Sequence, residues 1–372
     1  MRILLISGSL PPMRCGIGDY TGQLAESLAR RPGTTVAVLT DVAAESKLPA
    51  RGFDVLAVAR GWRFADALPI VRAVRRWKPD IAHMQFPTQG YGGRKLPWLL
   101  PSLLAARGVP IVQTWHEYVL QQPLPQLKGS VLNLPNAVLG GGLVVVRPHF
   151  LERMAPWYRR LLGRKQVQFI PNAPAIPVVE LSHAERSEIR SRLAAGSGQI
   201  VAYFGFAYPA KGVELLFEIA DPARHHLLLV CDLDPADPYH RSIRDRMNAG
   251  VWAGRATVSG FLPAEEVSRV LAAADAVVFP FREGGGRWNT SLEGAVAQGT
   301  FVITTSREQH GYDASKNIYC ARVDDVAEMR QALLDHAGRR AVQDGPREAA
   351  DWNTIADAHL RLYSSVLRRP VR

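Results

Sequence analysis

Residues 281–299, FREGGGRWNTSLEGAVAQG, carry residue types that together can hold an anion. Consecutive glycines let a ligand approach the main chain because no Cβ stands in the way. The residues TSLE at 290–293 then match a capping box, in which a threonine or serine precedes a glutamate by three positions at a helix start. The first amides of such a helix and its dipole attract negative charge. This stretch therefore predicts a site for a diphosphate.

A lysine in the same half of the chain adds a second positive element. Residues 201–220, VAYFGFAYPAKGVELLFEIA, read as a strand, a turn and a helix, with Lys211 and Gly212 in the turn. A full charge beside a helix start strengthens the binding of an anion. Lys-Gly alone is more typical of a solvated lysine beside a turn glycine. The glycine loop in the same half favours the anion site instead.

Histidines and paired carboxylates are the other candidates for chemistry. His116 follows the apolar run PIVQTW, and His83 lies within the run DIAHMQ, so each serves either a site or the core. The Asp-Leu-Asp at 232–234 has the spacing of two carboxylates that share a hard cation, which is one alternative. A hydrolase pair made by Glu283 and Glu293 is another. Their places on a glycine loop and a helix start suit the holding of a ligand better.

The elements that must position these residues follow from the apolar pattern. Short apolar runs alternate with stretches that have apolar residues at helical spacing, which predicts parallel sheets covered on both faces. Two such sets predict two doubly wound α/β domains, which bind ligands outside the carboxyl ends of their strands. The expected strands are 2–7, 35–40, 54–59, 80–85, 110–115, 142–147, 199–206, 226–232, 256–261, 276–281 and 300–305.

A proline-containing segment, FIPNAPAIPVVELS at 169–182, separates the two sets of strands. Its prolines continue neither a strand ladder nor a helix, and they read as a linker. We therefore expect one domain over 1–178 and a second over 179–350. Residues 351–372 carry a last pattern of helical spacing, and we expect this helix to pack back across the seam between the domains.

Bulk composition narrows the class of protein. The net charge of +11 over 372 residues favours anionic partners: nucleic acid, an acidic membrane surface or phosphorylated small molecules. No zinc-finger, basic-zipper or RNA-recognition signature accompanies it, so nucleic acid is not expected. No run of about 18 apolar residues occurs, and the start reads as a first strand rather than a signal peptide. The three cysteines lack metal-ligand spacing and are typical of free thiols in the cytoplasm.

Six segments resemble, in order and over nearly the whole chain, the motifs of the retaining glycosyltransferases of family 4. The resemblance implies the GT-B fold, in which two Rossmann-like doubly wound parallel-sheet domains face each other across a cleft. The first domain then binds the acceptor and the second a nucleotide diphosphate sugar, with no metal or other cofactor. The segments are SLPPMRCGIGDYTGQLAESLAR, VQTWHEY, FIPNAPAIP, AKGVELL, VSGFLPAEEVSRVLAAADAVVFPF and SLEGAVAQGTFVITT.

The resemblance also assigns roles to single residues. His116 contacts the sugar or the reaction centre and Glu283 grips the donor sugar, so these two are the expected catalytic residues. Glu293 holds the ribose, a role that competes with helix capping for the same carboxylate. The expected donor-binding residues are Gly16, Lys211, Arg287, Gly284, Gly285, Gly286, Thr290, Ser291, Leu292 and Glu293.

The sequence departs from the family pattern in two places. The first glutamate normally precedes Glu293 by eight residues, where Gly285 stands, whereas Glu283 precedes it by ten. The family also has an arginine five residues before the lysine, where this chain has Phe206. We expect Arg287, or secondarily Arg282, to supply that charge, because leaving-group stabilisation needs preorganised cations. The alternative is a catalytically impaired protein that binds a nucleotide-sugar or a partner.

The resemblance implies a metal-independent, retaining hexosyltransferase. The acceptor hydroxyl attacks from the side that the diphosphate leaves, and a phosphate oxygen takes its proton. Residues 94–108 and 147–165 mix basic and apolar residues in the acceptor-side domain. These segments either pack as core helices or dock on the anionic inner face of the cell membrane. A lipid-linked sugar or polysaccharide precursor of the envelope is then the expected acceptor, and a soluble one stays open.

Overall fold

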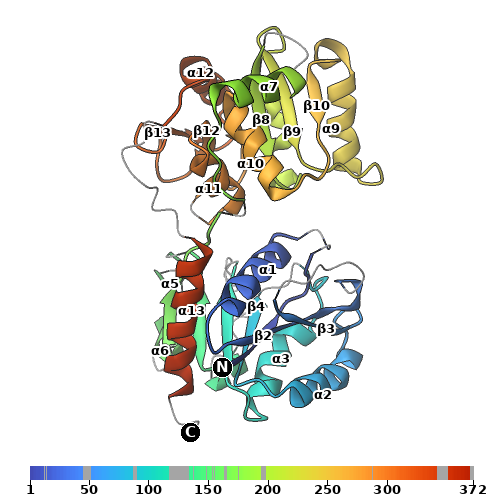
Figure 1. The fold of residues 1–372 in the computed structure, drawn as a ribbon, viewed down its shortest axis with the longest axis vertical. Coiled ribbons are helices and arrows are strands. Elements are labelled where there is room, and N and C mark those ends of the chain that lie inside the picture. The colour runs from blue at the N-terminus through green and yellow to red at the C-terminus, as the bar shows by residue number, and fades with distance from the viewer. Residues whose placement is uncertain are drawn as a thin grey trace. The chain divides into compact units, whose positions relative to one another are not determined.

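The chain folds into two compact units, seen in a computed structural model (Figure 1). One unit is Met1–Asn172 with Ala350–Arg372, and the other is Ala173–Ala349. The division falls in the proline-containing segment, a few residues before the boundary expected from the sequence. The structure describes residues 1–11, 13, 15–44, 52–86, 90–116, 134–136, 138–147, 149–152, 154, 156–162, 166–174, 176–193, 198–286, 288–341 and 351–368.

The first unit is built on a parallel sheet in the order β3-β2-β1-β4-β5-β6-β7. Residues 3–6 of β1 are all buried, so both faces of the sheet are covered, as its continuous apolar run predicts. The order reverses between β1 and β4, which marks the ligand-binding edge of such a sheet. The strands are β1 Arg2–Ile6, β2 Thr35–Asp41, β3 Asp54–Ala59, β4 Ile81–Phe86, β5 Ile111–Trp115, β6 Gly142–Val145 and β7 Gln166–Phe169.

The helices of the first unit include one from the far end of the chain. Helix α13, Trp352–Leu367, packs against α1, and Arg31 Nε donates to Asp357 Oδ1 at 2.7 Å. The ring of Tyr20 on α1 meets that of Trp352 edge-on at 5.2 Å. The last helix is thus a structural part of the first unit. The other helices are α1 Gly16–Ala29, α2 Ala67–Trp77, α3 Leu96–Ala105, α5 His149–Glu152 and α6 Pro156–Leu162, with 3-10 turns η1 Val42–Ala44 and η2 Phe64–Asp66.

The second unit repeats this plan with the order β10-β9-β8-β11-β12-β14-β13. Six of its strands are parallel, and only the edge strand β13 runs antiparallel, against β14. The order reverses between β8 and β11, where the lysine and glycine segments leave the sheet. The strands are β8 Gln199–Phe204, β9 His225–Val230, β10 Ala256–Val258, β11 Ala276–Phe279, β12 Phe301–Ser306, β13 Gly311–Asp313 and β14 Ile318–Arg322.

The two Rossmann-like sheets confirm the predicted doubly wound α/β class.

The helices of the second unit connect its strands. One element differs from expectation: Lys211-Gly212 is followed by a 3-10 turn and a four-residue helix rather than by a long α-helix. The helices are α7 His183–Leu193, α8 Leu216–Ile219, α9 Pro238–Asn248, α10 Ala264–Ala273, α11 Thr290–Ala297 and α12 Val326–His336, with 3-10 turns η3 Pro209–Lys211, η4 Val213–Leu215 and η5 Gly250–Trp252.

Candidate functional site

The glycine loop leaves the carboxyl end of β11 and folds against the end of β12. Gly284 has φ +84°, a conformation that favours glycine. A Cβ on Gly285 would lie 2.3 Å from Thr304 Oγ1, and one on Gly286 would lie 2.3 Å from the Trp288 ring. The loop's own packing therefore requires glycine at these positions. The close approach of a ligand, expected from the sequence, is not needed to explain them.

The glycine amides donate hydrogen bonds within the loop and to β12. The N–H of Gly284 donates to Phe281 O at 3.2 Å and that of Gly285 to Thr305 O at 2.7 Å. The N–H of Gly286 donates to Asn289 Oδ1 at 3.0 Å. The loop is thus a closed support that fixes the start of the following helix, and the amides available to an anion lie further along, in α11.

Helix α11 begins differently from the sequence prediction. Asn289, not Thr290, is the N-cap residue, and the predicted capping box does not form. The side chain of Asn289 accepts a hydrogen bond from Gly286 and makes none to the helix, so α11 has no side-chain cap. Within the described part of the chain, no acceptor meets the N–H groups of residues 290–292. Unpaired amides at a helix start form an anion site.

Lys211 lies against the beginning of the glycine loop. The N–H of Arg282 donates to Ala210 O at 3.1 Å, which ties the two segments together. Gly212 has φ +66°, and a Cβ there would lie 2.3 Å from Pro280 O. The Lys211 ammonium stands 4.4 Å from the centroid of the Phe281 ring. The structure therefore brings the predicted lysine and the predicted loop together through close contacts of their main chains.

The two arginines expected to replace the missing family charge have different outcomes. Arg287 lies outside the described residues. The guanidinium of Arg282 pairs with Glu214 Oε1 at 2.5 Å and with Asp324 Oδ1 at 2.8 Å. Its charge is thus neutralised by two carboxylates, which argues against Arg282 as a ligand for phosphate. The ring of Phe206, which stands at the family's arginine position, stacks on that of Tyr208.

Arg307 is a candidate that the sequence analysis missed. This exposed residue follows β12, and its Nε and Nη2 lie 3.4 Å from the carbonyl oxygens of Glu283 and Arg282. Its side chain also lies 3.7 Å from the position that a Cβ on Gly284 would occupy. The sequence could have indicated Arg307 as a site residue, because it comes just after a predicted strand, at the sheet edge where ligands bind.

The two glutamates stand at the ends of the loop. Glu283 is exposed, and its carboxylate receives no hydrogen bond from any described residue. Glu293 is half-buried in the first turn of α11, where its N–H donates to Asn289 O at 3.0 Å. In the Asp-Leu-Asp segment, Asp234 begins a turn, and its Oδ1 accepts the N–H of Ala236 at 2.8 Å.

His116 directly follows β5 in the first unit, as predicted. Its ring Nε2 lies 2.8 Å from Gln85 Oε1, and the ring of Tyr20 meets it edge-on at 4.7 Å. Burial, with smaller contributions from the nearby His359 and Arg147, lowers the pKa of His116 to about 3. The imidazole is therefore neutral at any ordinary pH. It can donate or accept a hydrogen bond but is not a cationic acid.

His83 belongs to the core. Its side chain is completely buried, with Nδ1 2.5 Å from the Tyr363 hydroxyl and Nε2 2.7 Å from Thr114 Oγ1. Both ring nitrogens are thus used to hold α13 and β5 onto β4. The choice between site and core, left open by the sequence, is decided for the core.

Gly16 is the first residue of α1 and differs from the glycines of the second unit. A Cβ built on it meets no described atom within 4 Å. The N-cap residue Cys15 makes no side-chain hydrogen bond to the helix. The start of α1 is therefore open at a glycine that its own packing does not require.

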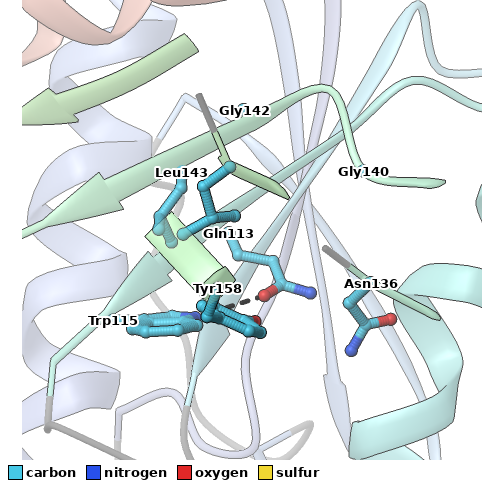
Figure 2. A pocket seen from close by; sticks show the side chains of 8 residues that line it. Gln113, Trp115, Asn136, Gly140, Gly142, Leu143 and Tyr158 are labelled. Carbon is cyan, nitrogen blue, oxygen red and sulfur yellow. Dashed lines mark hydrogen bonds between the residues drawn. The ribbon is translucent and has the colours of Figure 1, made fainter. Parts of the chain in front are cut away.

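A small cavity in the first unit is separate from these residues (Figure 2). Its volume of about 10 Å³ has room for roughly one water molecule. The Nε2 of Gln113 has no hydrogen-bond partner among the described residues, while its Oε1 accepts from Trp115 Nε1 at 3.3 Å. The cavity is suited to a buried water and not to a substrate. Its lining residues are Gln113, Trp115, Asn136, Gly140, Gly142, Leu143, Tyr158 and Leu162.

The basic, apolar helices of the first unit are partly core and partly surface. In α6, Tyr158 and Leu162 are buried, whereas Trp157 is 46% and Leu161 40% exposed. In α3, Leu99 is exposed while its neighbours on the other face are buried. None of the helices in the described ranges has the length and apolar character needed to span a membrane.

Comparisons with known proteins cover most of the chain. Residues 15–192 match the family model of the glycosyl transferase 4-like domain, and residues 198–337 match that of glycosyl transferases group 1. The 2-deoxystreptamine glucosyltransferase of Streptomyces kanamyceticus is 25% identical in an alignment 273 positions long that covers 68% of this chain and 66% of that protein. The match thus spans slightly less than two thirds of that relative.

Solved structures show the same fold. Sucrose-phosphate synthase of Thermosynechococcus elongatus superposes with a TM-score of 0.74 at 19% identity, over 98% of this chain and 99% of the other. Anabaena HepE, in complex with UDP and glucose, superposes with a TM-score of 0.69 at 15% identity, over 98% of each chain. Both matches extend over the two units described above.

Proposed function

We propose that this chain, which belongs to the family 4-like glycosyltransferases of GT-B fold, is a retaining hexosyltransferase that uses a nucleotide diphosphate sugar. The observation that carries the proposal is the contact between the Lys211 turn and the glycine loop, beside the uncapped start of α11. A lysine ammonium and three open amides are what a diphosphate requires. Arg307 is the described cation best placed to add to them, and Arg287 stays a candidate for the same role.

The proposed chemistry asks the protein for positioning and for stabilisation of an anion. The acceptor hydroxyl attacks the anomeric carbon from the side that the diphosphate leaves; the new C–O bond forms as the old one breaks. An oxygen of the departing phosphate takes the hydroxyl proton. Lys211 and the α11 amides stabilise the negative charge that builds on the diphosphate. Glu293 holds the ribose and Glu283 the donor sugar, and the neutral His116 binds a sugar hydroxyl in the first unit.

Glucose is the first hexose to test. The relative from Streptomyces is named for glucosyl transfer, and HepE was solved with UDP and glucose. A panel of UDP-, GDP- and ADP-sugars with product detection tests the proposal directly. We expect turnover with one donor, activity that survives EDTA, and loss of turnover in Lys211→Ala. Donor binding without any turnover would instead favour the catalytically impaired alternative.

For the acceptor, we propose a lipid-linked sugar or polysaccharide precursor at the inner face of the cell membrane. The exposed Trp157 and Leu161 accompany Arg159 and Arg160 in α6, and the chain carries a net charge of +11. Basic residues beside exposed aromatic and aliphatic side chains suit an anionic lipid surface. Vesicle flotation tests this part. Anionic vesicles should retain the protein at low salt and release it at high salt, and Trp157→Ser should weaken the retention. No retention would favour a soluble acceptor.

A further inference from the structure

A buried glutamine on the neighbouring strand holds the ring of His116. Gln85 lies in β4, is completely buried, and places its Oε1 2.8 Å from His116 Nε2. The register of the sheet pairs Gln85 with Thr114, so the contact joins the carboxyl ends of two adjacent parallel strands. The N–H of His116 also donates to Phe86 O at 2.9 Å. Main chain and ring of the histidine are thus both fixed by the end of β4.

We propose that Gln85 is a positioning residue that fixes His116 as the neutral tautomer with its proton on Nε2. A carboxamide oxygen only accepts hydrogen bonds, so Nε2 must be the donor in this contact. The other ring nitrogen, Nδ1, then carries a lone pair. Within the described residues no partner reaches Nδ1. This inference rests on the proposed function: His116 would accept a hydrogen bond from a hydroxyl of the sugar, and would not donate one.

Each of the two possible orientations of the Gln85 amide group goes with a different tautomer of His116. Its Nε2 is buried and has no hydrogen-bond partner among the described residues. An unpaired buried N–H group is unfavourable, and here it could be relieved by turning the amide over. The turned amide would donate to His116 Nε2 and force the ring proton onto Nδ1. The observed orientation and its reverse therefore predict opposite tautomers for the same histidine.

The ring ¹⁵N spectrum of the full chain, labelled in its histidines, tests the tautomer without reference to activity. We expect the signals of His116, assigned by their loss in His116→Asn, to show the proton on Nε2. In Gln85→Leu they should shift toward a mixture of tautomers, and in Gln85→Glu the Nε2 proton should be kept. Gln113→Leu is a matched control, because Gln113 is also a buried glutamine with an unpaired amide but contacts Trp115. A proton on Nδ1 in the wild type, or unchanged signals in Gln85→Leu, would overturn the proposal.

Kinetics then separate positioning from a merely structural role. Gln85→Leu should lower kcat/KM by roughly tenfold, the effect of one lost hydrogen bond in a site, and Gln113→Leu should change it little. In Gln85→Glu the new carboxylate raises the pKa of His116, so activity should be near wild type at high pH and fall as the ring becomes protonated. Equal losses in the two leucine variants, or an unchanged pH profile in Gln85→Glu, would refute positioning. A wild type without turnover would refute the proposed function, while the spectra would still decide the role of Gln85.

Discussion

The candidate site residues of the two units are held in place by different means. In the second unit the candidate groups are cationic or are N–H donors: Lys211 and Arg307 contact the glycine loop, and the open amides of α11 follow it. In the first unit, His116 is neutral, half-buried against Tyr20 and held by Gln85. A site for a diphosphate needs preorganised positive charge, whereas a site for sugar hydroxyls needs oriented neutral groups. The proposed reaction requires both kinds of group, one to bind the diphosphate and one to bind sugar hydroxyls.

Removal of the lysine charge should give the largest effect. We expect Lys211→Ala to lower kcat by about 10²–10³, the usual cost of losing one group that stabilises developing negative charge. Lys316→Ala is the control, because Lys316 is an exposed lysine of the same unit that pairs with Asp313. Initial rates with saturating donor measure both variants. Similar rates in the two variants would remove Lys211 from the site.

Two alanine substitutions should sharpen the comparison between the glycines. Gly285→Ala places a Cβ 2.3 Å from Thr304 Oγ1, so we expect a loss of about 1–3 kcal/mol in the free energy of unfolding. Gly16→Ala meets no described atom within 4 Å and should leave stability nearly unchanged while it lowers activity. Urea unfolding and kinetics on the same samples separate the two effects. Destabilisation by Gly16→Ala, or none by Gly285→Ala, would contradict this assignment.

Acid should weaken the first unit through its buried histidines. Burial lowers the pKa of His359 to about 4, below the ordinary 6.5. The histidine therefore binds a proton more readily in the unfolded chain than in the folded one. The contribution of neutral His359 to the free energy of unfolding is complete above pH 6.5 and is lost as the pH falls toward 4. The expected slope is about 1.4 kcal/mol per pH unit for this histidine. Hydrogen exchange of β4 at several pH values measures it, and His359→Gln should flatten the dependence; an equal slope in that variant would exclude His359 as the cause.

Single alanine substitutions of Arg307 and Arg282 should have the smallest effects on activity and stability. Arg307→Ala should raise the KM for the donor by roughly fivefold to tenfold, since one exposed charged hydrogen bond is lost. Arg282→Ala removes two partly exposed ion pairs and should cost under about 1 kcal/mol of stability without a change in that KM. Donor titrations measure both. A larger rise of the donor KM in Arg282→Ala than in Arg307→Ala would indicate that Arg282 belongs to the anion site.

The strands and helices that could be predicted from the sequence are those with a regular pattern of apolar residues. Continuous apolar runs such as RILLIS mark strands buried on both faces, so the two sheets could be read from the sequence. Strands β7, β13 and β14 were missed because most of their residues are partly buried or exposed, which leaves only short or broken apolar runs. Some strand boundaries were wrong: the expected strand covered 256–261, whereas β10 ends at Val258.

For the candidate site, the sequence predicted which two segments belong together. Lys211 and the glycine loop were assigned to one anion site, and the structure places them in contact. The capping box was wrong because the side chain of Asn289 turns back to Gly286, a choice of hydrogen-bond partner that spacing does not specify. Gln85 was missed for a similar reason, since a glutamine inside an apolar run gives no sign of what it will face across the sheet.

The return of α13 to the first unit has a consequence for biosynthesis. Tyr363 and Trp352 contribute to packing around β4 and α1, yet they leave the ribosome only after the entire second unit has been made. The second unit is therefore complete in sequence before the first one is, so the half that begins the chain is the last able to finish folding. A nascent chain truncated before Asp351 would leave the side of its N-terminal sheet that carries His83 without α13 and available to chaperones.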